Sequence, residues 1–274
     1  MIAVGSTRMA SLRSGPAYAS SHTSGFAAGE DVLSRAVWMK PFVNFADQNR
    51  RKGIAGYETE TYGAAIGGDF KVGRSTFGVS FSYSNTDVDS KGDGNAQSDI
   101  DSYQGTIYAD YTTKEWYVEG LFGYARNEMS GSRSISVNSL TANNDFGSNQ
   151  YMGNIGFGMP VEVDEGHYLT PNASIQYTLV DNETYTETGA GALNLRVDQD
   201  NVHQALGVFG VKYHTNNATD SGTLTPELRL SMTYDFANDE AVSTSNFTGG
   251  GATFNVEGAD VQEFGQQVGA GVSF

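Results

Sequence analysis

Apolar and polar side chains alternate along most of this chain from about Val37 onward. The clearest segment runs from Leu224 to Phe236, where every second residue is apolar or proline and the residues between are polar. The segment from Leu169 to Leu179 has the same period of two. A period of two is the signature of β-strands whose two faces meet different surroundings. The pattern therefore predicts an all-β protein built from segments of roughly ten residues.

The polar faces of these segments decide between two kinds of β protein. In a soluble sandwich the outer face meets bulk water and carries many Lys and Glu residues. Here Gly, Ser, Thr, Asn and Gln dominate, with isolated charges. This composition favours a transmembrane antiparallel up-and-down β-barrel with a wet interior. We expect the lumen to be lined by Lys40, Gly63, Gly67, Asp69, Lys71, Ser80, Ser82, Asp110, Glu119, Gly156, Glu227, Arg229 and Asp235. We expect lipid to contact Phe77, Val79, Phe81, Tyr83, Trp116, Val118, Phe122, Leu169, Ile175, Leu179, Leu228, Leu230 and Met232.

The connections between the predicted strands alternate between short and long, as in bacterial outer-membrane barrels, whose short turns are periplasmic. Short links are predicted at Gly73-Arg74, Thr113-Lys114, Glu165-Gly166 and Gly258-Ala259, with a longer one at 216–222. Long loops are predicted at 47–61, 87–98, 127–149, 181–200 and 238–246.

About eleven strands are expected up to Phe274, the first of them running outward. Because an odd count would end the chain on the outer side, we expect one last strand beyond Phe274. The run Val268, Ala270, Val272 and Phe274 is a candidate C-terminal insertion signal, and a coincidental strand end is the alternative.

Composition narrows the class of protein further. The 274 residues include 15 Tyr and 15 Phe but 5 Pro, which favours strands. A net charge of -16 argues against a nucleic-acid partner. The mean hydropathy is -0.38 and no long apolar run is present, which excludes a membrane-spanning helix. Without cysteine there is no disulfide framework. Met1 is not followed by a secretory signal, which indicates a cytosolic protein or a fragment.

No motif indicates a catalytic residue, a metal site or a cofactor. The run Asp87 to Gly92 begins like a calcium loop, but Lys91 stands where an oxygen ligand is needed and Ser98 where the bidentate acid belongs. The four histidines lack the spacing of a metal site. No nucleophile elbow or dinucleotide fingerprint occurs. We expect Gly249-Gly250-Gly251 to form a bulge or strand kink.

Several segments resemble the translocator β-domain of classical autotransporters. The blocks 25–30 and 35–42 resemble its opening, 62–70 its second strand and 77–88 its third. The segments 254–258 and 268–272 are similar to its tenth and eleventh strands. The order and spacing of these blocks make the joint resemblance strong, and it covers the chain from Gly25 to the end.

The resemblance implies a twelve-stranded barrel in the outer membrane of a Gram-negative bacterium. Residues 1–34 would be a linker remnant, with helix at most around 7–13, and residues 35–274 the translocator domain. Such a domain is not an enzyme and anchors and exports an N-terminal passenger. Its expected partners are that passenger, the barrel-assembly machinery, periplasmic chaperones, outer-membrane lipid and lipopolysaccharide.

Three alternatives remain: a passive porin-like channel, a barrel-type outer-membrane hydrolase and a soluble β-sandwich adhesin. The glycines at Gly63, Gly67, Gly123, Gly156 and Gly158 have two readings. They could widen the lumen, or they could permit strand curvature and close packing beneath a neighbouring aromatic.

Overall fold

The protein is dominated by one large antiparallel sheet. The computed structural model describes residues 34–50, 55–91, 96–136, 139–219, 222–237, 241–258 and 263–273, the side chains of Ser34 and Ser273 excepted. The sheet contains twelve strands, of which ten are long. These ten are β1 (Ser34–Gln48), β2 (Tyr57–Val72), β3 (Ser75–Ser90), β4 (Gln97–Thr112), β5 (Tyr117–Ile135), β6 (Leu140–Gly158), β8 (His167–Asn182), β11 (Val202–Thr215), β13 (Gly222–Asp235) and β16 (Phe264–Ser273). The other two, β7 (Val161–Asp164) and β12 (Asn217–Thr219), extend single hairpins.

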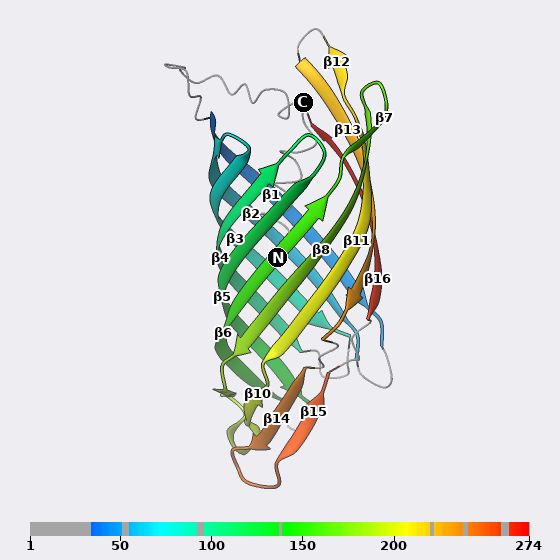
Figure 1. The fold of residues 1–274 in the computed structure, drawn as a ribbon. Coiled ribbons are helices and arrows are strands. Elements are labelled where there is room, and N and C mark those ends of the chain that lie inside the picture. Colours follow the sequence, from blue (N-terminus) through cyan, green and yellow to red (C-terminus); the bar gives the residue numbers. More distant parts are fainter. Residues whose placement is uncertain are drawn as a thin grey trace.

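The long strands pair in chain order and curl round a common axis (Figure 1). Each pair is antiparallel and in continuous register, for example from Ser75↔Tyr111 to Asp89↔Gln97 between β3 and β4. The turns at 73–74, 113–116 and 165–166 lie at one end of this cylinder. We call it the short-turn end and the opposite end the loop end. Three of the predicted short links are thereby confirmed.

The strand count is ten among the described residues, where the sequence predicted about eleven. The segment predicted as a tenth barrel strand, Phe254–Glu257, lies outside the large sheet. As a result β16 runs back toward the short-turn end, where β1 begins. The count of eleven, on which the parity argument rested, therefore does not hold among the described residues, and a strand beyond Phe274 stays a prediction. Among the described residues β1 and β16 each pair on one side only.

Several predicted loops are strand instead. β5 and β6 are 19 residues long and stay paired as far as Ile135↔Leu140, across most of the predicted loop 127–149. The ladder continues because backbone hydrogen bonds do not depend on the polarity of the side chains. Hydrophobic alternation ends earlier, where both faces of the hairpin become polar. The alternation therefore predicts only the part of each strand that has an apolar face, and not the full length of the strand.

A second, four-stranded sheet stands at the loop end (Figure 1). It is formed by β9 (Tyr185–Thr186), β10 (Leu195–Gln199), β14 (Val242–Phe247) and β15 (Phe254–Glu257). The glycines 249–251, predicted to be a bulge, belong to the connection between β14 and β15, where Gly250 and Gly251 have φ values of 98° and 125°. Gly258 follows β15 at the loop end, and Ala259, the other residue of the short link predicted there, lies outside the described residues.

Regular helix is confined to one 3₁₀ turn, Gly191–Leu193, among the residues that the structure describes. Within the same residues, no helix is long and apolar enough to cross a membrane. The helix predicted around 7–13 and nearly all of the predicted linker 1–34 lie outside the described residues. The predicted barrel domain begins one residue after the start of β1.

Candidate functional site

The outer face of the large sheet is apolar and exposed. Of the residues predicted to contact lipid, the most exposed are Ile175 at 65%, Val79 at 60% and Met232 at 56%. Leu179 is less exposed than the others and is half-buried. Leu228 and Leu230 are 45% and 49% exposed. The remaining members of the set are also exposed: Phe77, Phe81, Tyr83, Trp116, Val118, Phe122 and Leu169. Because this row is open rather than covered by a second sheet, the soluble sandwich alternative was wrong.

The predicted lumen residues lie on the other face, and none of them is exposed. Asp69, Ser82 and Asp235 retain 7%, 3% and 3% of their accessible surface, and Gly156 is buried. The rest are half-buried: Lys40, Gly63, Gly67, Lys71, Ser80, Asp110, Glu119, Glu227 and Arg229. The two predicted sets therefore fall on opposite sides of one sheet. Their assignment to lipid and to lumen stays a prediction.

An aromatic cluster with a polar edge occupies part of the inner face. The indole Nε1 of Trp38 donates a hydrogen bond to the Tyr108 hydroxyl at 3.0 Å, and that hydroxyl donates to Asp69 Oδ2 at 3.0 Å. Tyr108 also packs with Leu121, and Trp38 packs against both. The cluster joins β1, β2, β4 and β5, strands that are not all neighbours in the ladder. It therefore ties the wall together across its inner surface.

Most of the inward glycines are covered by a neighbouring side chain. A Cβ atom at Gly67 would lie 2.4 Å from the Trp38 ring, and one at Gly63 would lie 2.4 Å from the Phe42 ring. Gly158 is covered by Tyr117, Gly123 by Met152 and Gly156 by Glu119. Of the two readings left open by the sequence, close packing beneath a larger neighbour accounts for these glycines.

Several inward charges are bonded within the wall itself. Asp110 accepts hydrogen bonds from the Thr76 amide at 3.1 Å and the Thr112 hydroxyl at 3.0 Å. Asp235 accepts from the amides of Ala205 at 3.2 Å and Ala237 at 3.1 Å. Glu227 forms an ion pair with Arg229 on the same strand. These side chains stabilise the wall as well as making its inner surface polar.

Other buried polar atoms of the inner face form no hydrogen bond within the described residues. They include Gln104 Oε1, Asn154 Oδ1, Thr170 Oγ1 and Thr178 Oγ1. Buried polar atoms in folded proteins are nearly always satisfied by protein or by water. This face is thus suited to contact water or a polar chain rather than to form a dry core.

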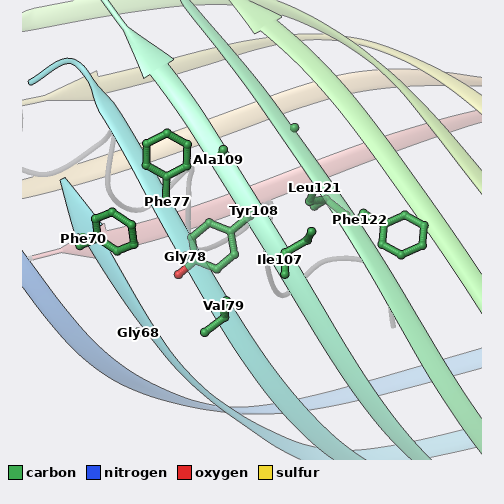
Figure 2. A pocket seen from close by; sticks show the side chains of 11 residues that line it. Gly68, Phe70, Phe77, Gly78, Val79, Ile107, Tyr108, Ala109, Leu121 and Phe122 are labelled. Carbon is green, nitrogen blue, oxygen red and sulfur yellow. The ribbon is translucent and has the colours of Figure 1, made fainter. Parts of the chain in front are cut away.

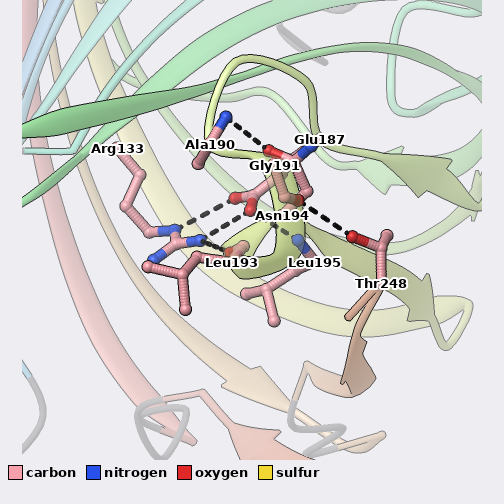
Figure 3. Close-up of polar contacts among 8 residues, drawn as sticks. All are labelled: Arg133, Glu187, Ala190, Gly191, Leu193, Asn194, Leu195 and Thr248. Carbon is pink, nitrogen blue, oxygen red and sulfur yellow. Dashed lines mark hydrogen bonds and ion pairs between the residues drawn. The ribbon is translucent and has the colours of Figure 1, made fainter. Parts of the chain in front are cut away.

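At the loop end, a segment that sequence analysis treated as a loop is fastened to the extended β5–β6 hairpin (Figure 3). Arg133 Nε and Nη2 donate to the two carboxylate oxygens of Glu187 at 3.0 and 2.6 Å. Nη2 also donates to the Leu193 carbonyl at 3.2 Å, and the Leu195 amide donates to Glu187 at 2.8 Å. The Glu187 side chain is 4% exposed, and this hydrogen bonding raises the pKa of Arg133.

Two further contacts support this attachment. We call the contacts among Arg133, Glu187, Leu193 and Leu195, together with these two, the loop clamp. Phe146 and Tyr185 stack with ring centroids 4.4 Å apart, and Asn143 and Thr188 exchange backbone hydrogen bonds of 2.8 Å each. Burial raises the pKa of Tyr185. Sequence reasoning missed the clamp because Arg133 lies 54 residues before Glu187 and 60 residues before Leu193 in the chain.

Comparison with known proteins now decides the family. The model of the autotransporter β-domain family matches residues 37–274. The chain belongs to the autotransporter β-domain family. It is 30% identical over 257 residues to outer membrane protein A of Rickettsia conorii, and the match covers 89% of this chain but 13% of that protein. The β-domain thus corresponds to about an eighth of the length of this curated relative.

Two solved autotransporter structures share the fold of this β-domain. The translocator domain of autotransporter NalP from Neisseria meningitidis superposes with a TM-score of 0.64 at 16% identity, covering 97% of this chain and 94% of that one. The β-domain of the Bordetella autotransporter BrkA gives 0.61 at 15% identity, covering 87% and 98%. The autotransporter β-domain is thus an outer-membrane translocator of a Gram-negative bacterium.

The histidines and the acidic run of this β-domain serve other contacts. His167 and His203 are hydrogen-bonded to the hydroxyls of Tyr213 and Tyr177 at 2.7 and 2.6 Å, while His214 stacks on Tyr168. Lys91 pairs with Asp47 and Glu58. The described residues contain no group of three or more side chains suited to a metal ion.

Proposed function

We propose that this β-domain anchors an N-terminal passenger in the outer membrane and that the polar inner face lines the route by which the passenger is exported. The observation that carries the proposal is the separation of the two faces of the sheet. The outer face exposes residues such as Val79 and Ile175, and the inner face buries Asp69 and Gln104. A sheet with this polarity suits hydrocarbon outside and water inside.

The direction of β1 gives the reason for a route through the interior. β1 begins at the short-turn end, which we assign to the periplasm as in other outer-membrane barrels. A passenger joined to the N-terminal side of β1 therefore starts in the periplasm. To appear at the cell surface it has to cross the barrel, because the outer face is occupied by lipid. The inner face offers polar atoms such as Asn154 Oδ1 and Thr178 Oγ1 to a polar chain.

The pore is expected to be narrow. Barrels of eight strands are filled by their own side chains, whereas those of 16 to 18 strands enclose an aqueous channel. A barrel of intermediate size has room for about one polypeptide segment. In this proposal the domain has no catalytic role of its own.

The further partners follow from the same location. We propose that periplasmic chaperones and the barrel-assembly machinery insert the domain, and that Val268, Ala270 and Val272 contribute to the signal they read. Val268 and Val272 are 77% and 69% exposed, so their side chains are accessible in the folded strand. Phe274, the last member of the predicted signal, lies outside the described residues. The exposed outer row would contact lipid and lipopolysaccharide.

Surface display tests the proposal. A secretory signal and a short unstructured epitope are placed before residue 1 of the full chain, and intact cells are treated with protease. We expect the epitope to be cleaved from outside while the barrel is protected. The control carries the same epitope after an uncleaved signal anchor that holds it in the periplasm.

An epitope that stays protected in cells whose barrel is inserted would contradict the proposal. Planar-bilayer recordings then distinguish a translocator from the passive-channel alternative. A translocator with a chain in its interior gives low conductance, and deletion of the residues before β1 is expected to raise it. High conductance of the full chain would favour the channel.

A further inference from the structure

A hollow lies in the outer face of the sheet near the short-turn end (Figure 2). It has a volume of about 510 Å³, within the range of ligand-binding pockets. It spans four strands, β2 to β5, and its lining is almost entirely apolar. The exposed side chains round it are Phe70, Phe77, Val79, Ile107 and Phe122.

Small outward residues produce the hollow. Two adjacent rows of the ladder cross it: Phe70, Phe77, Ala109 and Gly120 form one, and Gly68, Val79, Ile107 and Phe122 the other. Ala109, Gly120 and Gly68 leave space between the large neighbours. Beneath it lie Tyr108 and Leu121, whose side chains are buried on the inner face. Phe70 and Phe77 stack at 5.6 Å and form one wall.

The outward glycines of the hollow differ from the inward ones in what surrounds them. A Cβ atom at Gly120 would approach no heavy atom nearer than 3.8 Å, and one at Gly68 none nearer than 3.5 Å. No neighbouring side chain fills the space, in contrast to Gly67 beneath Trp38. The space at these positions is therefore open to the surroundings of the outer face.

Two cations stand at the rim of the sheet beside the hollow. Arg74 lies in the β2–β3 turn, three residues before Phe77, so roughly 10 Å away along the strand. The Arg74 carbonyl accepts a hydrogen bond from the Thr112 amide at 2.9 Å, which holds this turn beside the β4–β5 link that contains Lys114. Both side chains are exposed, and neither pairs with a described carboxylate, although Glu115 follows Lys114 in sequence.

Aromatic residues mark the level between the cations and the hollow. Tyr111 and Trp116 pack at 5.6 Å, and Trp116 stacks with Phe157 at 6.3 Å. Aromatic side chains of this kind gather at the boundary between hydrocarbon and headgroups. The order from the rim inward is thus cation, aromatic belt, apolar hollow, which is the order of phosphate, glycerol and acyl chain in a lipid.

We propose that the hollow holds one acyl chain of an anionic glycerophospholipid whose phosphate is bound by Arg74 and Lys114. The inference rests on the membrane orientation proposed above, and it adds a specific lipid site to a general lipid contact. Charge complementarity selects the anionic lipid, because attraction to a basic residue at a membrane surface favours it over a zwitterionic one. The apolar lining favours an acyl chain as the part of the lipid that occupies the hollow.

Lipid titration followed by native mass spectrometry tests the proposal on the full chain folded in detergent. Phosphatidylglycerol and phosphatidylcholine with identical chains are the two probes. We expect one phosphatidylglycerol molecule to be retained and to bind about 25-fold more tightly than phosphatidylcholine. Each of the two cations is expected to increase the affinity for the anionic lipid about fivefold. The double variant Arg74→Gln/Lys114→Gln is expected to bind both lipids equally and weakly.

A second pair of variants distinguishes the contribution of the acyl chain to binding from that of the headgroup. A Cβ atom at Gly120 meets no heavy atom nearer than 3.8 Å, so Gly120→Leu places a side chain in the hollow. This variant is expected to weaken the binding of both lipids about tenfold, by excluding roughly two methylene groups. Gly105→Leu is the matched control, because Gly105 lies on the same face, has no heavy atom within 4 Å of its Cβ position and does not line the hollow. Circular dichroism and heat-modifiable gel mobility establish that each variant is folded.

Three results would overturn the lipid site: equal retention of the two lipids by the wild-type chain, equal binding by the Gly120→Leu and Gly105→Leu variants, or displacement of phosphatidylglycerol by lipid A at equal concentration. Surface display of the epitope by Gly120→Leu keeps the two proposals apart. Display by Gly120→Leu without lipid retention would leave the export function intact. Lipid retention by a wild-type chain that fails to display the epitope would leave the lipid site intact.

Discussion

The wall of the barrel and the four-stranded sheet at its loop end are both antiparallel sheets, but different interactions maintain them. The wall strands are 10 to 19 residues long, and all but the terminal two pair on both sides over most of their length. The strands of the small sheet have 2 to 6 residues. The small sheet is fastened to the wall by the loop clamp, through Arg133, Glu187 and the Phe146–Tyr185 stack.

This difference shows two sources of order in one chain. In the wall, each residue faces either the exposed apolar side or the buried polar side, so polarity and size are constrained at every position. In the small sheet, burial is confined to a few residues such as Val197 and Ser245, and a few specific contacts fasten the sheet to the wall. The wall should therefore fail through a wrong polarity or a crowded inner face, and the small sheet through the loss of one contact.

The largest effect is expected from a charge on the outer face of the wall. Leu230→Arg should destabilise the barrel by about 2–4 kcal/mol, the cost of an arginine near the middle of a bilayer. Urea unfolding in lipid vesicles measures it. Thr244→Arg in β14 is the control, since Thr244 is exposed in the small sheet and should change the unfolding free energy little. Equal losses for the two variants would remove the distinction between the regions.

The next effect is local to the small sheet. Glu187→Ala removes both hydrogen bonds from Arg133 and the one from the Leu195 amide, and should destabilise the small sheet by about 2–3 kcal/mol. Hydrogen exchange is expected to accelerate at β10 and β14, while β3 and β4 keep their protection. Acceleration spread evenly over both sheets would contradict the independence of the two regions.

A crowded inner face should produce a smaller loss within the wall. Gly67→Ala places a Cβ atom 2.4 Å from the Trp38 ring and 2.8 Å from the Val79 carbonyl, which should cost about 1–2 kcal/mol. The matched change Gly105→Ala meets no atom within 4 Å and should be nearly neutral. The difference in urea midpoint between the two variants is the measurement. Identical midpoints would mean that the Trp38 ring moves aside freely.

The smallest effect concerns pH at the loop end. A hydrogen bond from Arg126, 2.6 Å long, lowers the pKa of the Glu183 carboxyl below its ordinary value of 4.5. Because the folded state has the lower pKa, this pair stabilises it above pH 4.5, and the contribution is lost as the pH falls through the lowered value. Limited proteolysis of 183–200 should therefore increase in acid. Glu183→Gln should be cleaved faster at neutral pH and show a smaller increase.

Particular residues show how far sequence reasoning reached. The alternation placed Leu228, Leu230 and Met232 on one face and Glu227 and Arg229 on the other, and the structure separates them in the same way. The polar hairpin extension beyond Asn127 gave no such signal, so its strands were predicted as loop. The segment 254–258 was assigned to the barrel because it resembles the tenth strand of the translocator family, although its partner is β14.

The sequence alone determined that this chain forms strands with one apolar and one polar face, because the side on which a residue points is fixed locally by the period of the strand. The resemblance blocks also placed it in its family. Only the tertiary structure decided the number of wall strands, the second sheet, the covering of the inward glycines and the hollow on the outer face. These depend on contacts between residues far apart in the chain, such as Arg133 with Glu187 and Trp38 with Tyr108. Where both faces of a strand contact water, any polar residue is tolerated at each position. The sequence of such a strand therefore has no alternating pattern from which the strand could be predicted.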